Sequence, residues 1–227
     1  GTENVAVGQV ALDANTTGSY NTAIGRHSLS SATTASNNTA VGRNAMGDNT
    51  TGATNVAVGG SAMAGNTTGG TNVAVGQNAL SSNTTASNNV AVGYDALGAS
   101  TTATGSTAVG RFAGDAITTG NSNTVMGNGA GGGITTGSAN TCIGESTGNA
   151  VVILTTGSDN VIIGQDCRTG AVDNDAAIVI GHAVTGAGTR NFTFGDGTTD
   201  SNIAFGATSI TAPSDIRLKE DIQNEEV

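Results

Sequence analysis

The sequence predicts an all-β fold, a repetitive parallel β-roll or β-solenoid of 17-residue coils. The first observation is a glycine that closes an Asn-Val-Ala-Val-Gly-like segment and recurs every seventeen residues. A pair of threonines, first seen at Thr16 and Thr17, keeps the same period. Only 3% of the 227 residues are aromatic, which is too few for the core of one compact domain. A period this strict is typical of stacked coils. The recurring glycines are Gly8, Gly25, Gly42, Gly59, Gly76, Gly93, Gly110, Gly127 and Gly144.

Disorder is the alternative that a chain rich in Gly, Ser, Thr and Asn raises first. Two observations argue against it. The apolar residues fall at fixed positions of the repeat, which a disordered chain does not need. Only 11% of the residues are charged, whereas disordered chains usually carry enough charge to repel themselves open. We therefore expect an ordered rod.

The expected strand of each coil comes directly before the recurring glycine, which we number position 0. Positions −3 and −1 carry Val, Ile, Thr or Met, and position −2 carries Ala in the first seven coils. Successive residues of a strand point to opposite faces, and both faces are apolar here. We expect the β-branched face to fill the coil interior and the alanine face to meet a neighbouring subunit.

Four further positions of the repeat have an expected role. Position −4 is Asn in nearly every coil, so stacking aligns the amides into a ladder. Position 0 is always Gly, which predicts a corner with positive φ or close backbone approach. Position +4 is Leu or Met in the first coils but Gly114, Gly131 and Gly148 later, which predicts different packing there. Position +1 is variable and polar. We expect it to face water and to determine the chemical character of the surface.

The end of the chain departs from the period. After Gly144 the marked glycines are Gly164, Gly181, Gly195 and Gly206. We predict a repeat shaft over residues 1–188, a neck of shortened repeats over 189–213, and a separate segment over 214–227. Thirteen coils spaced about 4.8 Å apart give a rod about 60 Å long. A single coil of this size encloses little volume, so we expect association into a homotrimer with three-fold symmetry.

Charge and composition exclude several classes of function. The net charge is −10, which argues against nucleic acid as a partner, because binding the phosphate backbone requires many basic residues. No apolar run is long enough for a membrane span, so we expect no membrane insertion. His27 and His182 have no partners at metal-ligand spacing, and we predict no metal and no cofactor. Cys142 and Cys167 are interpreted as small buried apolar residues.

The pattern Asn-x-Val-Ala-Val-Gly resembles the head repeat of trimeric autotransporter adhesins, over most of residues 4–181. Those heads are left-handed parallel β-rolls with a shorter repeat. The resemblance implies a related coil and a trimer.

The segment Ala212-Pro213-Ser214-Asp215-Ile216-Arg217-Leu218-Lys219 resembles the start of the endosialidase-type intramolecular chaperone domain of phage tail fibres and tailspikes. That domain assembles the trimer and then cuts itself off. The resemblance implies that Ser214 is the nucleophile, Lys219 its partner, and the bond after Ser214 the cleavage site. A desolvated lysine can act as the base that a serine requires. The remainder of such a domain is missing, so this chain should not cleave itself. The alternative is that Ser214 and Asp215 only cap a short charged helix.

The sequence therefore predicts the shaft of a homotrimeric phage tail fibre, located extracellularly on the virion. Its expected partners are other tail proteins and a host cell-surface receptor, either a glycan or an outer-membrane component. The alternatives are a trimeric adhesin on a bacterial cell surface and, more remotely, an ice-binding solenoid. We do not expect a polysaccharide depolymerase, which needs paired carboxylates in a groove, because Asp13, Asp48, Asp95 and Glu145 occupy different positions of the repeat.

Overall fold

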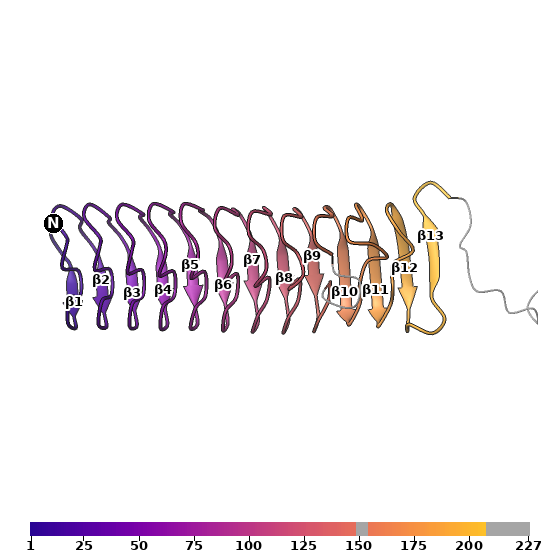
Figure 1. The fold of residues 1–227 in the computed structure, drawn as a ribbon, viewed down its shortest axis with the longest axis horizontal. Coiled ribbons are helices and arrows are strands. Elements are labelled where there is room, and N and C mark those ends of the chain that lie inside the picture. Colours follow the sequence, from indigo (N-terminus) through magenta and orange to yellow (C-terminus); the bar gives the residue numbers. More distant parts are fainter. Residues whose placement is uncertain (149–153, 208–227) are drawn as a thin grey trace, which may run out of the picture.

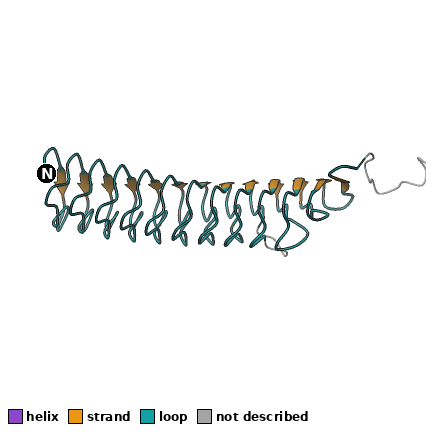
Figure 2. Cartoon of the chain, turned by 90° about the horizontal axis from the view of Figure 1, so that it is seen from above, coloured by secondary structure: helices purple, strands orange, loops and turns teal. Residues whose placement is uncertain are grey.

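The computed structural model describes residues 1–148 and 154–207, which form a single row of stacked coils (Figure 1). Thirteen strands make one sheet in the order of the sequence, and the described residues contain no helix. Seen from above, the strands line one side of the rod and the loops fill the other (Figure 2). The predicted all-β parallel solenoid is thus confirmed. The strands are β1 (Val5–Val7), β2 (Thr22–Ile24), β3 (Thr39–Val41), β4 (Val56–Val58), β5 (Val73–Val75), β6 (Val90–Val92), β7 (Thr107–Val109), β8 (Thr124–Met126), β9 (Thr141–Ile143), β10 (Val161–Gln165), β11 (Ile178–His182), β12 (Asn191–Gly195) and β13 (Ser201–Ala204).

Equivalent residues of neighbouring coils stack directly on one another. In the β4–β5 pair, Ala57 lies opposite Ala74 and Val58 opposite Val75, and the same 17-residue offset relates all pairs from β1 to β9. The β9–β10 pair keeps the alignment across an offset of twenty residues, with Cys142 opposite Ile162. The three additional residues are therefore taken up outside the sheet.

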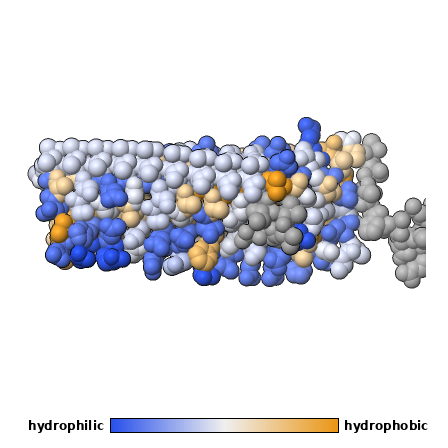
Figure 3. Space-filling model, in the orientation of Figure 1, coloured by the Kyte–Doolittle hydropathy of each residue, from blue (hydrophilic) through white to orange (hydrophobic). Residues whose placement is uncertain are grey.

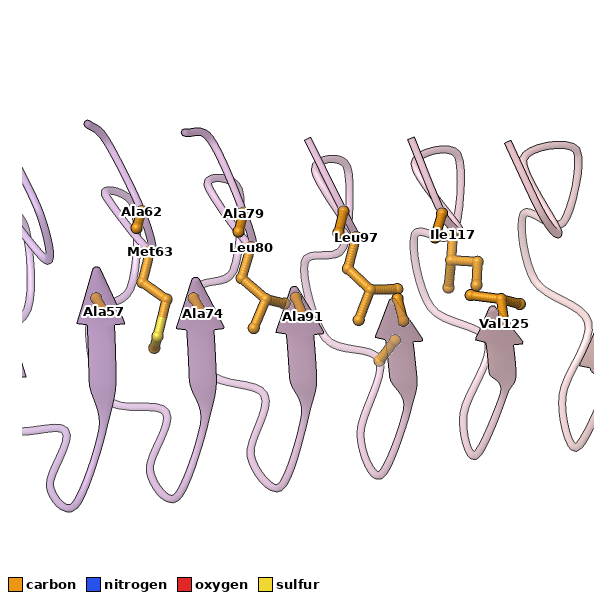
Figure 4. Close-up of a cluster of buried hydrophobic side chains, with 14 of the residues drawn as sticks. Ala57, Ala62, Met63, Ala74, Ala79, Leu80, Ala91, Leu97, Ile117 and Val125 are labelled. Carbon is orange, nitrogen blue, oxygen red and sulfur yellow. The ribbon is translucent and has the colours of Figure 1, made fainter. Parts of the chain in front are cut away.

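The two faces of each strand are oriented opposite to our prediction. From β2 to β7 the alanines at position −2 are fully buried, whereas the neighbouring β-branched residues are partly exposed, at 36% for Val58 and 37% for Val75. The reason is that a large side chain from the loop side already fills the coil interior. Figure 4 shows Met63 and Leu80 extending toward the strands, and both are completely buried. Only alanine leaves room for them, so the bulky face of the strand points outward.

The asparagines at position −4 form the predicted ladder and also brace each coil from within. Asn72 donates from Nδ2 to the carbonyl of Ala86, 2.9 Å away on the far side of the same coil. Its Oδ1 accepts the backbone N–H of Asn89 in the next coil at 2.9 Å. The amide is fully buried, and an unpaired amide would be costly there. Each Asn therefore ties its own coil together and joins it to the next.

The glycine at position 0 is required by both conformation and space. Gly127 has a φ of +134°, and a Cβ there would lie 2.6 Å from the carbonyl oxygen of Gly144. A Cβ atom does not come this close to a carbonyl oxygen, so the stacked glycines allow the coils to approach. Each regular coil also holds non-glycine residues with positive φ, as at Asn78 and Leu80. A left-handed residue costs about 1–2 kcal/mol, and these residues direct their N–H groups to carbonyls of neighbouring coils.

The C-terminal end of the described rod is a hairpin rather than two shortened coils. Strand β12 pairs in parallel with β11, but β13 runs antiparallel to β12. The expectation of a thirteenth parallel coil is therefore wrong, because the residues between these strands are too few to return the chain around the rod. Asp196 stabilises the connecting turn by accepting the N–H groups of Thr198 and Thr199. These bonds, with that of the Thr198 hydroxyl, lower the pKa of the Asp196 carboxyl to about 2.

Candidate functional site

The predicted self-cleavage residues, Ser214 and Lys219, lie outside the described residues, as does the expected helical segment over 214–227. Their assignment stays a prediction based on the resemblance. Three surfaces of the described part of the chain are regular enough to act as interaction sites.

The first surface is the outward-pointing side of the sheet, which we call the outer sheet face. It consists of positions −3 and −1 of β1–β12, and neither row contains a charged residue. Several of its members are more than a third exposed even where the coils are regular, among them Ile24 at 39%, Met126 at 43% and Ile143 at 36%. The face continues through β11, where Ile180 is 38% exposed, and ends at Phe192 and Phe194, whose rings lie 5.1 Å apart.

The second surface follows the ends of the strands and is called the strand-end edge. It consists of positions +1 and +2, directly after the glycine corner. All three basic residues within 1–144, Arg26, Arg43 and Arg111, occupy position +1. In Figure 3, the edge to which the strands point in Figure 1 carries a hydrophilic band over the first coils and a hydrophobic patch further along.

An aromatic cluster lies on this edge between two adjacent coils. The rings of Tyr94 and Phe112 meet edge to face, with centroids 5.3 Å apart and an angle of 85°. The guanidinium carbon of Arg111 lies 4.2 Å from the centroid of the Phe112 ring. The backbone supports the arrangement, because the Phe112 N–H donates to the Tyr94 carbonyl at 2.9 Å. Tyr94 remains 43% exposed.

The third surface is the double row of threonines. The hydroxyl of the first threonine in each pair donates to the carbonyl of the equivalent residue one coil on, as from Thr50 to Thr67 at 3.0 Å. The second threonine, such as Thr51 or Thr68, is exposed. Only one row of free hydroxyls is therefore presented, as expected from the alternation of side chains.

Two carboxyls of adjacent coils, Asp95 and Asp115, are close enough to interact. Burial raises the pKa of the Asp115 carboxyl above its usual value, and the Asp95 carboxylate raises it further. Asp115 is half-buried in a turn of its coil. Within 1–148 and 154–207, no group of three or more His, Cys, Asp or Glu side chains is placed to hold a metal ion.

Both cysteines are free and buried, as interpreted from the sequence. Burial raises the pKa of the Cys142 thiol to about 12, so this group stays protonated at neutral pH and is a poor nucleophile. It takes the place of alanine in the core of its coil.

No helix among the described residues has the length and apolar character that would let it cross a bilayer. Comparison with models of protein families, with curated proteins and with solved structures gave no match to this chain.

Sequence reasoning did not identify the aromatic cluster or the outer sheet face as surfaces. A signal for the cluster was present, since Arg111 follows Tyr94 by seventeen residues and so stacks on it. The signal for the outer face was the constant alanine at position −2, which leaves room for the large residue at position +4.

Proposed function

We propose that this chain is the shaft of a homotrimeric phage tail fibre that mediates attachment to the host. The observation that supports it best is the outer sheet face, an uncharged strip of Val, Ile, Met, Phe and Thr side chains on the side of a long rod. Eleven steps of about 4.8 Å from β1 to β12 and a width of about 7 Å give the strip an area on the order of 400 Å². Apolar patches of this size on soluble chains are often interaction sites.

A second and a third copy of the chain are the partners that fit this strip. It is flat, and its rungs repeat with the coil spacing, so an identical strip can match it along the whole rod. Three such rods around one axis would cover all three faces, which gives a closed assembly with no apolar strip left exposed. This replaces the expected contact through alanine, since the alanines are buried within the coil.

Multi-angle light scattering tests the assembly directly. The proposal predicts a mass three times the 21.9 kDa of one chain. Replacing Val58 and Val75 by Glu should reduce the mass to that of the monomer, because burying an unpaired carboxylate in the interface is costly. Both side chains point outward, so the single coil stack should keep its circular dichroism spectrum.

Replacing Gln9 and Gln77 by Glu provides the matched control, since it adds the same two negative charges on the strand-end edge rather than on the outer face. This variant should stay trimeric. A monomeric mass for the unchanged chain at micromolar concentration would refute the trimer.

The C-terminal part of the proposal concerns maturation. A self-cleaving chaperone would follow the shaft, with Ser214 as nucleophile and Lys219 as its partner. In a chain extended by a complete chaperone domain, Ser214→Ala should abolish cleavage while the trimer still forms. Cleavage that persists in this variant would show that another residue is the nucleophile. We propose no other enzymatic activity and no cofactor.

A trimeric adhesin on a bacterial cell surface is the second candidate, because a rod with the same outer face would serve it equally well. The gene that encodes the chain distinguishes the two, since a complete chaperone downstream favours the fibre and a membrane anchor favours the adhesin. The ice-binding alternative receives less support, because only one row of threonine hydroxyls is free. Thermal hysteresis measured on the purified chain would revive it.

A further inference from the structure

We propose that the strand-end edge is a binding site for an acidic polysaccharide. This inference rests on the proposed attachment function and names the class of ligand and the residues that hold it. The residues that carry it are Arg26, His27, Arg43, Tyr94, Arg111 and Phe112.

The distribution of charge along the rod is the first argument. The chain has a net charge of −10, yet from Gln9 to Gly129 the strand-end edge carries one acidic residue, Asp95, against three arginines. Arg26 and Arg43 are stacked on adjacent coils, and both are exposed. Their backbones lie about 4.8 Å apart, so both guanidinium groups can reach one anion, which offsets the repulsion between them. Guanidinium groups bind carboxylate and sulfate in bidentate geometry.

The aromatic cluster is the second argument. An exposed tyrosine that is held in place by a neighbouring ring loses little conformational entropy when a ligand stacks on it. Arg111 over Phe112 adds a cation beside the exposed Tyr94 ring. The C–H bonds on the flat face of a sugar carry a slight positive charge and match the negative face of an aromatic ring. A sugar ring on Tyr94 thus places its acidic substituent within reach of Arg111.

The spacing along the edge is the third argument. Arg26 and Arg111 are five coils apart, or about 24 Å, so one extended polymer can contact both clusters at once. Between them lies Gly60, where an added Cβ would meet nothing within 4 Å, which leaves a notch in the edge. A polymer that bridges both clusters gains from multivalency, since the second contact forms within the same complex.

Nucleic acid is the competing ligand, because stacked aromatics with arginines also bind single strands. We favour the polysaccharide because three arginines spread over this length neutralise few phosphates. The test therefore includes a nucleic acid.

Binding of the full chain to immobilised polymers provides the test, with polygalacturonate, dextran sulfate, neutral dextran and oligothymidylate as probes. We expect binding to at least one acidic polysaccharide, none to dextran, and weaker binding as salt rises from about 50 to about 200 mM. Polygalacturonate and dextran sulfate separate carboxylate from sulfate recognition. Failure of both acidic polymers to bind, or equal binding of oligothymidylate, would overturn the proposal.

Matched variants assign the binding to this edge. Replacing Arg26 and Arg43 by Gln should weaken binding about tenfold. This is the effect expected for losing one charge-assisted contact, because the two arginines share one anion. Arg43→Gln alone should also weaken binding, whereas Arg190→Gln, which likewise removes one positive charge but at the opposite edge, should change affinity less than about twofold. Tyr94→Ala should weaken binding, and Tyr20→Ala, an exposed tyrosine before β2, should not. Equal losses in variant and control would place the site elsewhere.

The mass of each variant is measured in parallel. A chain that is trimeric and adsorbs to host cells but binds neither acidic polymer contradicts this inference alone. A monomeric chain that still binds the polymers through Arg26 and Arg43 contradicts the proposed fibre assembly and leaves the inference intact.

Discussion

A Cβ atom on Gly114 would lie 2.9 Å from Cδ1 of Ile117 in the same coil. Ile117 occupies the interior space that Leu97 fills in the preceding coil, and both side chains are fully buried. The large core residue thus moves from position +4 to position +7, and glycine at position +4 makes room for it. Figure 4 shows Leu97 and Ile117 in successive coils with Val125 below. Position +7 in the Leu97 coil is Ser100, and each of the eight coils from Gly8 to Gly127 holds one large residue at one of the two positions.

This exchange predicts strong coupling between the two positions. Gly114→Leu alone should destabilise the fold by about 1–3 kcal/mol through overpacking. Ile117→Ser alone should cost about 2–5 kcal/mol through the cavity that it leaves. The double variant copies the Leu97 coil and should be more stable than the sum of the two changes predicts, by about 1 kcal/mol or more. Urea denaturation at fixed protein concentration measures all four chains. Simple additivity would mean that the two side chains do not share one space.

A second prediction compares two adjacent glycines. Gly59 has a φ of +142°, and a Cβ there would lie 2.6 Å from the carbonyl carbon of Gly76. Gly59→Ala should therefore destabilise the rod by about 2 kcal/mol or more, because conformational strain and steric overlap act together.

Gly60→Ala is the control for this change. An added Cβ at Gly60 meets nothing, so its effect should stay within about 0.5 kcal/mol or be slightly stabilising. Thermal unfolding of both variants gives the comparison. Equal losses of stability would contradict the role assigned to the glycine corner.

The sequence predicted the coil, its register and the asparagine ladder, because each depends only on a strict period. It did not predict which strand face lies inside. Alternation shows that Ala74 and Val75 point in opposite directions, but the choice between them depends on Leu80, which reaches the interior from the loop side. The sequence also did not predict that β13 runs antiparallel to β12. Phe205–Gly206 repeats the residue types that end a coil, but the spacing from Gly195 to Gly206 is too short for a full coil. The site on the strand-end edge required knowledge of which residues stack, as Tyr94 and Phe112 do.

A third prediction concerns pH. Since the pKa of Asp115 in the folded chain is raised above 3.8, the folded state binds more protons than the unfolded state between the two pKa values. Stability contributed by this group therefore falls as pH rises through that interval, and the loss is complete above the folded pKa. Asp115→Asn should raise the thermal midpoint at pH 7. It should have little effect well below pH 3.8, where the Asp115 carboxyl is protonated in both the folded and the unfolded state.

Asp48→Asn is the comparison for this variant, since Asp48 is exposed and its replacement reports the general effect of removing one negative charge. The stabilisation by Asp115→Asn should exceed that of Asp48→Asn at pH 7. Destabilisation by Asp115→Asn at pH 7 would show that the carboxylate makes a favourable contact that outweighs its burial.

The last prediction uses the one serine within the asparagine ladder. Ser106 is buried, and its hydroxyl oxygen accepts the N–H of Asn123 at 3.2 Å. A serine is too short to donate across the coil as Asn72 does to Ala86. Ser106→Asn should add that bond, to the carbonyl of Gly120, and stabilise the rod by about 1 kcal/mol.

The reverse substitution completes the comparison. Asn72→Ser should remove the bond to the Ala86 carbonyl, which keeps the Asn83 amide as its other donor at 3.1 Å, at a cost of about 0.5–1.5 kcal/mol. Chemical denaturation of both variants at one protein concentration measures the two effects. Their opposite signs follow from a single hydrogen bond that spans the coil, so a destabilising Ser106→Asn would indicate that this coil is too narrow to hold the larger amide.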